Sequence, residues 1–453
     1  MSILSGILLA LCFPKFNLWP LAFVALVPLF IEIEKKKTAR EAAVSGFIFG
    51  LVFFGINLFW INTLIPYGGP FVPLGWLLLA AGEALFVALA CYLISFSNLR
   101  LKSRVYISAL IWVGIEYLRS LGPFGITAGT VGYTQAHFLP IAQLASFSTV
   151  YGVSFLIVLV NLVLARFYLT RKNYLELSMV LVVFLSSFFW GSSQIPNHLE
   201  AYGPKALTIS LIQGSIPQER KLDHRYNAEN FKIHLDLTRQ ALKEKPDLII
   251  WPETVVFTYI LNDPPYRKAM EDLAREAKAY LLTGTPFYDR SGNIYNSIVA
   301  FSPSGEVVSR YDKQHLVAFG EYLPFRPLLY PILQSTNLFQ ADFVPNPHTS
   351  HLILGKRKVA AGICFESTFT GLLREQAPGA AFLLAVTNDG WFNDSAAPYQ
   401  HFENGVFRAI ENRKYFIQCA NTGISGVIDP YGRIIKQTKV FKRGSLTFKI
   451  PLP

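Results

Sequence analysis

The sequence is poor in charged side chains, and its first 222 residues contain no aspartate. Lys, Arg, Asp and Glu make up 16% of the 453 residues, against roughly a quarter in typical soluble domains. The first aspartate is Asp223, and 52% of the residues are hydrophobic. This composition excludes a disordered chain and an ordinary soluble globule, and it indicates extensive contact with lipid. The chain has only four cysteines, which excludes a disulfide scaffold.

The few charges are distributed unevenly. Up to Ile195 there are 12 basic and 6 acidic residues, whereas the remaining 258 residues hold 29 basic and 24 acidic ones. We therefore predict a transmembrane domain over residues 1–195 and a water-soluble domain over residues 196–453. The net charge of +11 is shared almost equally between them, so neither has the concentrated basic field that nucleic-acid binding requires. We expect no nucleic-acid partner.

Apolar runs in the first part are long enough for about seven membrane helices. A break at Pro14 to Asn17 divides the first run into two short helices. A cleavable signal peptide is the alternative for the first residues, but no basic segment precedes the run and it continues past any small-residue cleavage site. The runs lie at residues 3–32, 42–64, 73–97, 105–120, 140–165 and 175–194.

Basic clusters predict the orientation of these helices, because Lys and Arg in short loops mark the cytoplasmic side. Uncharged segments at 65–72 and 121–135 alternate with the clusters, and one more span follows the last cluster. We therefore expect residues beyond 195 to lie outside the cytoplasm. The sequence ends in GSLTFKIPLP without a further apolar run, so its C-terminus is expected there too. The clusters are Lys35 to Lys37 with Arg40, then Arg100, Lys102 and Arg104, then Arg166, Arg171 and Lys172.

Three charged residues, Glu83, Glu116 and Arg119, fall within or beside apolar runs. Charge is costly in a membrane and is commonly functional there. Glu116 and Arg119 are also three residues apart, so they could simply neutralise each other on one helix face. Both interpretations remain open.

The second part alternates short β-rich apolar runs with helical stretches, which predicts a layered α/β or α+β domain. Helices are expected near 226–244, 265–278 and 400–413, and the β-rich runs are ALTISLIQG, DLIIWPE, YLLTGTPFY, NSIVAFSP, EVVSRYDK, KVAAGICFE, AFLLAVTND and FIQCANTGISGVIDP. It has no Gly-rich phosphate loop and no CxxC or HExxH spacing, so nucleotide and zinc sites lack support. Its histidines, including His315 and His401, are scattered. We interpret them as ordinary hydrogen-bonding residues.

Three of the strand-like runs end in a titratable residue, at Glu253, Lys313 and Cys364. Active residues favour strand ends. A carboxylate can take the proton of a thiol, the thiolate can attack a carbonyl carbon, and an ammonium with backbone N–H groups can stabilise the oxyanion. Singly, each residue fits a structural role equally well, because a buried Cys usually acts as a small hydrophobe.

The sequence around each of these residues resembles one of the three catalytic blocks of the nitrilase superfamily of carbon–nitrogen hydrolases. The resemblance implies an αββα sandwich in which Glu253 is the base, Lys313 assists and Cys364 is the nucleophile. Glu321 and Glu366 match positions that support the site in that superfamily. The three blocks are Trp251 to Glu253, Tyr311 to Tyr322, and Gly362 to Glu366.

A polytopic α-helical membrane domain joined to such a sandwich resembles the apolipoprotein N-acyltransferase family. Phe365 stands where that family usually has Tyr, so the ring remains and the hydroxyl is lost, and Leu222 replaces a usual Trp. Other departures are Ala318 and Asn393. Further matching blocks are LWPLAFVALVPL at 18–29, Ile115 to Arg119, GYTQ at 132–135, SLIQGSIPQ at 210–218, and Thr387 to Phe392 leading to Gln400 and His401.

The resemblance implies a specific reaction. A fatty acyl chain would pass from a membrane phospholipid, through a Cys364 thioester, to the free amine of the diacylglyceryl-cysteine that begins a bacterial apolipoprotein. It implies no metal or nucleotide cofactor, and a multi-pass protein of the bacterial inner membrane with its catalytic domain on the periplasmic side. Both substrates are anchored in the bilayer, which gives them a high effective concentration.

Other interpretations compete with this one. A membrane-anchored amidase would use the same three residues and let water take the acyl group. A transporter or lipid-binding protein could carry an inactive nitrilase fold. A structural interpretation pairs Cys364 with Cys419 in a disulfide.

Overall fold

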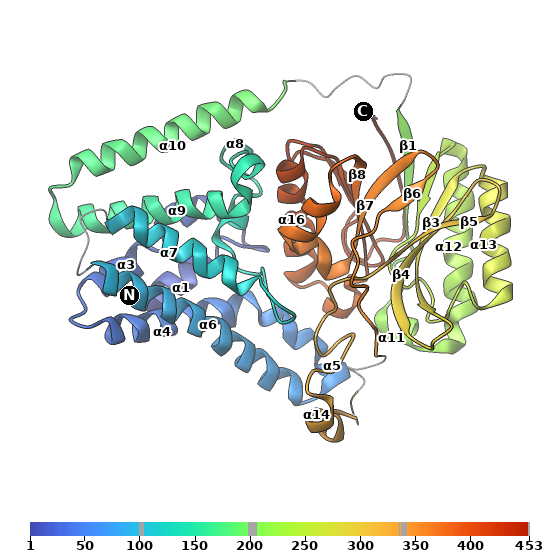
Figure 1. Ribbon diagram of the computed structural model, residues 1–453, viewed down its shortest axis with the longest axis horizontal. Coiled ribbons are helices and arrows are strands. Elements are labelled where there is room, and N and C mark those ends of the chain that lie inside the picture. The colour runs from blue at the N-terminus through green and yellow to red at the C-terminus, as the bar shows by residue number, and fades with distance from the viewer. Residues whose placement is uncertain (99–103, 198–205, 335, 337–341, 452–453) are drawn as a thin grey trace. The chain divides into compact units, whose positions relative to one another are not determined.

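A computed structural model of the chain describes residues 1–98, 104–197, 206–334, 336 and 342–451 (Figure 1). Its contacts divide the chain into two compact units, Met1–Pro196 and Asn197–Pro453. The first is helical throughout its described part, and the second contains every described strand. The predicted basic residues Arg100 and Lys102 lie outside the described residues.

The helical unit consists of long helices joined by short helical turns. The break predicted near Pro14 separates α1 from the next helical turn, and η1, α2 and α3 follow in close succession. The α helices are α1 (Ser2–Ala10), α2 (Ala22–Ala25), α3 (Val27–Glu34), α4 (Ala39–Asn57), α5 (Ile65–Gly68), α6 (Phe71–Asn98), α7 (Arg104–Arg119), α8 (Leu139–Ala142), α9 (Ala145–Thr170) and α10 (Tyr174–Gln194), and the 3-10 turns are η1 (Trp19–Leu21), η2 (Phe59–Leu64) and η3 (Val131–Gln135).

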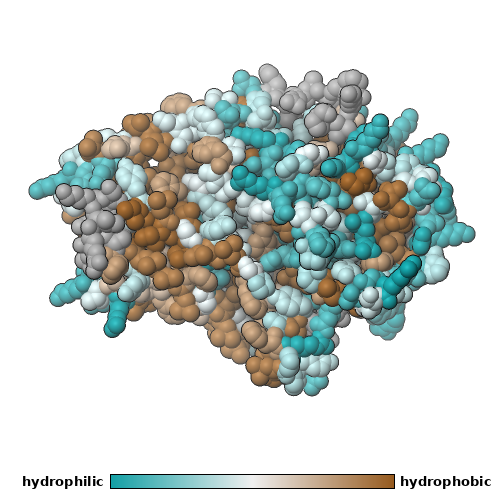
Figure 2. All heavy atoms as spheres, in the orientation of Figure 1, coloured by the Kyte–Doolittle hydropathy of each residue, from teal (hydrophilic) through white to brown (hydrophobic). Residues whose placement is uncertain are grey.

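Four of these helices, within the described residues, are long and apolar enough to cross a membrane. They lie at Ala39–Asn57, Phe71–Phe96, Ala145–Thr170 and Tyr174–Gln194. Hydrophobic residues dominate the visible surface of the helical unit, whereas hydrophilic residues dominate that of the second unit (Figure 2). The predicted polytopic helical membrane part is confirmed, while the count of seven spans stays a prediction.

Helices α4 and α6 approach closely because small residues face each other. A Cβ added at Gly50 would lie 2.7 Å from Cα of Ala84, and one added at Gly46 would lie 2.7 Å from Sγ of Cys91. Glycines four residues apart lie on one helix face, and such spacing lets helix backbones pack tightly in membranes. These two helices form the densest helix pair of the unit.

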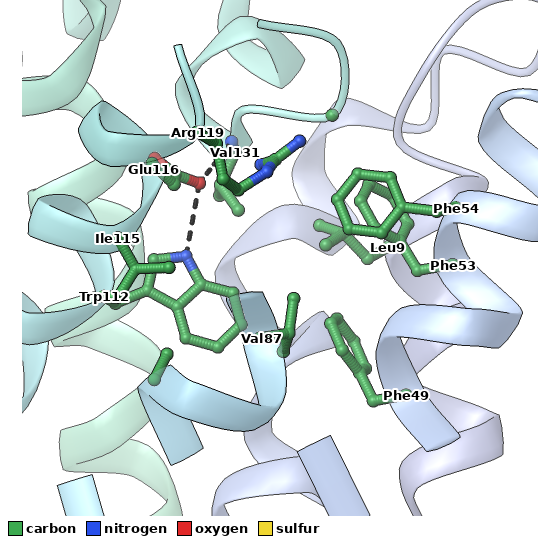
Figure 3. A pocket seen from close by; sticks show the side chains of 12 residues that line it. Leu9, Phe49, Phe53, Phe54, Val87, Trp112, Ile115, Glu116, Arg119 and Val131 are labelled. Atoms are coloured by element: carbon green, nitrogen blue, oxygen red, sulfur yellow. Dashed lines mark hydrogen bonds between the residues drawn. The ribbon is translucent and has the colours of Figure 1, made fainter. Parts of the chain in front are cut away.

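The three charged residues of the apolar runs are all buried. Arg119 forms an ion pair with Glu83 of α6 and donates to the carbonyl of Ala128 at 2.7 Å. Glu116 accepts from Nε1 of Trp112 at 3.2 Å and from the N–H of Val131 at 2.9 Å, beside a small cavity with mostly apolar walls (Figure 3). The spacing of Glu116 and Arg119 predicted that they are neighbours on one helix. Arg119, however, forms its ion pair with Glu83 on another helix.

The second unit contains two six-stranded sheets. Their strand orders are β12-β1-β2-β3-β4-β5 and β11-β10-β9-β8-β7-β6. The strands are β1 (Leu207–Gln213), β2 (Leu248–Ile250), β3 (Tyr280–Tyr288), β4 (Ile294–Phe301), β5 (Val307–Asp312), β6 (Leu352–Leu354), β7 (Arg357–Ile363), β8 (Ala380–Thr387), β9 (Phe416–Ala420), β10 (Gly426–Ile428), β11 (Ile434–Gln437) and β12 (Gly444–Ile450).

The two sheets pack face to face over one apolar core, to which both contribute Ile, Leu and Phe side chains. Helices α12 (Asn227–Ala241) and α13 (Pro264–Ala277) cover the outer face of the first sheet, and α15 (Thr370–Gln376) and α16 (Ala397–Asn412) lie against the second (Figure 1). The predicted αββα sandwich is therefore confirmed. The remaining helices of this unit are α11 (Gln218–Leu222), α14 (Arg326–Leu333), η4 (His224–Tyr226), η5 (Leu242–Glu244), η6 (Cys364–Thr368) and η7 (Asp389–Phe392).

Strand direction determines which chain segments meet. Strands β1, β2 and β3 are parallel, and β5 runs in the same direction because two antiparallel pairings connect it to β3. In the other sheet, β7, β8 and β9 are parallel. The C-terminal ends of parallel strands lie at one edge of a sheet, which is where sites form in α/β proteins.

Candidate active site

Glu253 lies just beyond the C-terminal end of β2, where the backbone makes a tight turn. The next residue, Thr254, has a positive φ of 45°. The turn lies against β3, since a Cβ added at Gly284 would be 2.5 Å from Cα of Glu253. Only glycine at that position lets the turn pack against the strand. The local fold thus fixes the position from which the carboxylate projects.

The carboxylate of Glu253 is 7% exposed and is held on both sides. Its Oε1 accepts from Nδ2 of Asn296 in β4 at 2.8 Å, and its Oε2 accepts from the N–H of Asn388 after β8 at 2.8 Å. A buried carboxylate needs such partners, because an unpaired one is costly. The first sheet and the second therefore both orient this group.

Lys313 follows β5, and its side chain is 1% exposed. Its Nζ lies 2.9 and 2.8 Å from the two carboxylate oxygens of Glu321 and 4.0 Å from Oε1 of Glu253. Burial disfavours the ammonium, but Glu321 and Glu253 outweigh that effect and raise the pKa of Lys313 above its ordinary value. Lys313 is therefore a permanent cation at neutral pH.

Cys364 directly follows β7 and begins η6 with a positive φ of 53°. Non-glycine residues rarely adopt that conformation, which presents a side chain at a sharp strand-to-helix turn. Burial and the Glu253 carboxylate raise the pKa of the Cys364 thiol above its ordinary value, and Lys313 opposes them. The thiol therefore keeps its proton at neutral pH until a base removes it.

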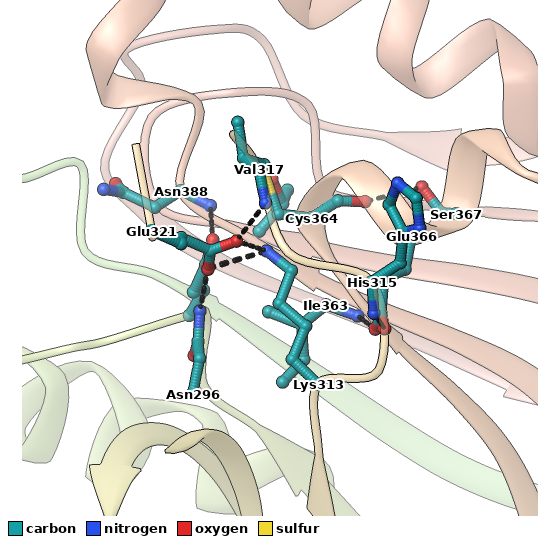
Figure 4. A network of polar contacts seen from close by, with 12 residues as sticks. Asn296, Lys313, His315, Val317, Glu321, Ile363, Cys364, Glu366, Ser367 and Asn388 are labelled. Carbon is teal, nitrogen blue, oxygen red and sulfur yellow. Dashed lines mark hydrogen bonds and ion pairs between the residues drawn. The ribbon is translucent and has the colours of Figure 1, made fainter. Parts of the chain in front are cut away.

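Figure 4 shows Lys313 and Asn296 joined to Glu321 by polar contacts. Glu321 accepts from Asn296, Lys313 and the N–H of Val317, each at 2.8 to 2.9 Å. Asn296 thus bridges Glu321 and Glu253 with one amide group. The structure brings Glu253, Lys313 and Glu321 into one hydrogen-bonded network, in which Glu253 and Lys313 occupy the predicted strand ends.

Glu366 is fully buried, and its hydrogen bonds connect two loops. Its Oε1 accepts from the N–H groups of Gln314 and His315, and its Oε2 accepts from the N–H of Ile363 and the hydroxyl of Tyr311. Burial raises the pKa of Glu366 to about 7, although these donors oppose the shift. Glu366 joins the segment after Lys313 to the turn at Cys364 without pointing to the thiol.

Phe365, the residue after Cys364, belongs to an aromatic cluster. Its ring packs edge-on against Phe369 at 4.9 Å between centroids and lies 5.9 Å from the His315 ring. No disulfide involves Cys364, since all four cysteines are free. Cys419 is instead buried in the core, with its thiol 3.2 Å from the carbonyl of Ile250.

A second buried lysine lies at the site, although no pattern along the chain identified it as a site residue. Nζ of Lys221, in α11, donates to the backbone carbonyl of Glu253 at 2.9 Å. Burial lowers the pKa of Lys221 to about 7, against the opposing charges of Glu253 and Cys364. The available signal was its place directly after the SLIQGSIPQ block, which by itself says nothing about burial.

His401 and Asp389 also lie beside Cys364, although His401 was interpreted as an ordinary hydrogen-bonding residue. Ligand-type atoms of Cys364, Asp389 and His401 all lie within 4.8 Å of one another. Such a group could hold a cation, but both ring nitrogens of His401 already face protein oxygens at 2.9 to 3.0 Å. A cation would have to break one of those hydrogen bonds, so the arrangement fits a metal poorly.

Taken together, the geometry suits acyl transfer through a thiol. It supplies a nucleophile, a carboxylate base, a fixed cation and backbone N–H groups close together. Cys364 is half-buried, whereas the side chains of Glu253 and Lys313 are buried.

Two family models match the chain, one in each unit. The model described as Apolipoprotein N-acyltransferase N-terminal domain matches residues 5–163, and the model described as Carbon-nitrogen hydrolase matches residues 208–453.

Curated relatives match over nearly the whole length. The chain is 36% identical to the apolipoprotein N-acyltransferase of Geobacter metallireducens, with 100% of this chain and 89% of the relative covered. It is 33% identical to that of Haemophilus influenzae, covering 99% and 88%. Among solved structures, an amidase from Nesterenkonia sp. is 20% identical, with a TM-score of 0.43 over 56% of this chain and 94% of that one. Nit3 of Saccharomyces cerevisiae is 19% identical, with a TM-score of 0.43 over 55% and 93%.

Proposed function

Because this chain belongs to the apolipoprotein N-acyltransferase family, we propose that it transfers a fatty acyl chain from a membrane phospholipid to the N-terminal amine of a diacylglyceryl-cysteine apolipoprotein. The observation that carries the proposal is the convergence of Glu253, Lys313 and Cys364 in a unit whose sequence matches the carbon-nitrogen hydrolases. The match to full-length acyltransferases supports it over simple amide hydrolysis.

In the first half-reaction, Glu253 takes the proton of the Cys364 thiol, and the sulfur attacks the ester carbonyl carbon of the phospholipid. The Lys313 ammonium and a backbone N–H at the Cys364 turn hold the oxyanion of the tetrahedral intermediate. When the C–O bond breaks, Glu253 returns the proton to the departing alkoxide. The products are a lysophospholipid and an acyl-Cys364 thioester.

In the second half-reaction, the free amine of the acceptor attacks the thioester carbonyl. The C–S bond breaks, an amide bond forms, and a proton from the nitrogen passes through Glu253 to the Cys364 sulfur. The thioester is more activated than the amide that replaces it, so the transfer needs no nucleotide. Glu321 and Glu366 support the site by holding Lys313 and the Cys364 turn, and Phe365 flanks the acyl group.

The chain is a membrane protein, as its four apolar helices and its family indicate. We place it in the bacterial inner membrane, with about seven spans in residues 1–195 and the catalytic domain, residues 196–453, on the periplasmic side. The basic clusters support that orientation. Reporter fusions after residue 200 and at Pro453 should both be exported, and a cytoplasmic signal at either position would contradict it.

The test of the reaction is the mass of the full-length protein after incubation with phospholipid alone. One fatty acyl group should appear on the peptide that contains Cys364. Hydroxylamine should release it, and an added diacylglyceryl-cysteine peptide with a free amine should accept it. Release of free fatty acid at the same rate with and without that peptide would make the protein a hydrolase.

A further inference from the structure

A buried histidine and a buried aspartate lie beside Cys364. Nδ1 of His401, in α16, lies 2.9 Å from Oδ1 of Asp389. Its Nε2 lies 3.0 Å from the carbonyl oxygen of Cys364 and 2.9 Å from Oγ of Ser367. Asp389 is 1% exposed, and Thr387 donates to it at 3.0 Å. None of these contacts is required to hold Glu253 or Lys313.

The partners of the ring indicate its protonation. A carboxylate and a carbonyl oxygen only accept hydrogen bonds, so both contacts are satisfied when both ring nitrogens carry a proton. The Ser367 hydroxyl donates to the same Cys364 carbonyl at 3.0 Å, so its oxygen is free to accept from Nε2. Burial opposes a charged ring, but Asp389 outweighs it and raises the pKa of His401. The hydrogen-bond partners of the ring thus favour its doubly protonated form beside the Asp389 carboxylate.

The hydrogen bond from His401 to the Cys364 carbonyl also affects the N–H on the opposite side of the same peptide group. In a trans peptide the C=O and the following N–H point in opposite directions. His401 and Ser367 thus fix the direction of the N–H of Phe365. Phe365 is the second residue of η6, and the first N–H groups of a helix have no partner within it. That N–H belongs to the residue directly after Cys364, so it is the backbone donor expected to face the oxyanion of a tetrahedral intermediate formed on the sulfur.

A charged donor on a carbonyl also strengthens the N–H of the same amide, because hydrogen bonds in a chain polarise one another. We propose that the His401–Asp389 pair positions and polarises the Cys364–Phe365 peptide, so that the Phe365 N–H stabilises the oxyanion of each half-reaction. The inference rests on the proposed acyl transfer, and both residues act as positioning residues.

The central variant is Asp389→Asn, which keeps the shape of the side chain and removes the charge that holds the imidazolium. Two reactions of the same thiol are compared in the full-length protein. Acylation by an ester forms an oxyanion, whereas alkylation by iodoacetamide displaces iodide and forms none. The Asp389 charge raises the pKa of the Cys364 thiol, so its removal leaves alkylation equal or faster.

Acylation should respond in the opposite direction. Loss of one oxyanion donor costs on the order of 10²-fold, so a weakened donor should slow the maximal single-turnover acylation rate by about tenfold or more. The phospholipid concentration for half-maximal rate should not change. His401→Gln, whose amide can still donate to the carbonyl, should retain more acylation than His401→Leu.

The matched control is His234→Gln. His234 is another fully buried histidine of this unit, with Nδ1 2.8 Å from the carbonyl of Asn230 in α12. That variant should react at wild-type rates in both assays. Acylation and alkylation that fall in parallel in Asp389→Asn, or an unchanged acylation rate, would overturn the inference.

A short-chain nitrophenyl ester is used as a second acyl donor, because it forms the same oxyanion without lipid recognition. Wild-type protein that reacts with the nitrophenyl ester and not with phospholipid would overturn the proposed donor. The comparison of Asp389→Asn with wild type on the nitrophenyl ester then still decides the role of the pair. Wild-type protein that reacts with neither would overturn both proposals.

Discussion

The helical unit and the sandwich unit both bury charged side chains, but they satisfy them differently. In the helices, Arg119 finds Glu83 on a neighbouring helix and a carbonyl at Ala128, and Glu116 uses the N–H of Val131. Ala128 and Val131 both belong to the connection after α7. Backbone groups within a helix are already paired, so buried charges there depend on other side chains or on loops.

In the sandwich unit, backbone N–H groups at and beyond strand ends donate hydrogen bonds to the buried carboxylates. Glu253 accepts from Asn388 N–H, Glu321 from Val317 N–H, and Glu366 from three N–H groups. Strand ends leave such groups unpaired and aim them at one edge of the sheet. The sandwich can therefore surround a thiol with several fixed charges. The helical unit instead holds a few charged side chains, which connect its helices to one another.

Among the variants of the two units, removal of the Cys364 thiol should have the largest effect on activity. Cys364→Ala should abolish acyl transfer and acyl-adduct formation, because no other group can carry the acyl chain. Expression, membrane insertion and thermal stability should stay near wild type. Cys419→Ala is the control, since Cys419 is a buried core residue; it should retain activity. Mass spectrometry after phospholipid incubation measures both, and an adduct on Cys364→Ala protein would remove Cys364 from the mechanism.

Removing one cation from each unit sharpens the comparison. Lys313→Met leaves Glu253 and Glu321 without their cation, and Arg119→Met leaves Glu83 without its own. Breaking a buried pair in this way costs about 3–5 kcal/mol, so both variants should melt at lower temperature in detergent. The folded fraction of Lys313→Met should also form no acyl adduct within the time of one wild-type turnover. Near-normal adduct formation would show that Lys313 only stabilises the fold.

The two lysines beside Glu253 should differ in how stability depends on pH. The pKa of Lys221 is lowered to about 7 in the folded protein, whereas the unfolded chain has the ordinary pKa of 10.5. Between these values the unfolded chain binds the additional proton, so the contribution to stability rises with pH and is lost as pH falls through 7. The raised pKa of Lys313 leaves it charged in both states across this window.

Melting temperatures in detergent at pH 7 and pH 9.5 test this expectation. The change toward higher stability at pH 9.5 should be smaller in Lys221→Met than in wild type. Lys232→Met is the control, because the Lys232 side chain is 73% exposed and pairs only with Asp236 at the surface. The same pH response in all three proteins would mean that Lys221 keeps its proton.

The smallest effect is expected in the helical unit, at the contact of α4 with α6. Gly50→Ala places a methyl group 2.7 Å from Cα of Ala84, and overpacking of this kind costs about 1–3 kcal/mol. Gly55→Ala, in the same helix, meets only the Trp76 ring at 3.9 Å and should leave the melting temperature unchanged or slightly higher. Equal melting temperatures for the two variants would show that the helices separate without cost.

Local patterns predicted most of the sandwich unit. The run ALTISLIQG forms β1, DLIIWPE contains β2, and KVAAGICFE contains β7 followed by the Cys364 turn. The helix expected near 400–413 is α16, at Ala397–Asn412. Strands β6, β11 and β12 were missed, because they are short or largely exposed, and β12 is recognisable mainly by its antiparallel pairing with β1.

The sequence by itself predicted a division near residue 195, a layered α/β or α+β second part and the strand-end positions of Glu253, Lys313 and Cys364, while the αββα sandwich was implied by the family resemblance. Charge density and the alternation of apolar residues are local properties, so they can be read along the chain. Only the tertiary structure decided that Lys221 supports Glu253, that Arg119 pairs with Glu83, and that His401 and Asp389 hold the Cys364 carbonyl. Each of these contacts joins residues 12 to 37 positions apart in the chain, and only the packing of separate elements selects such partners.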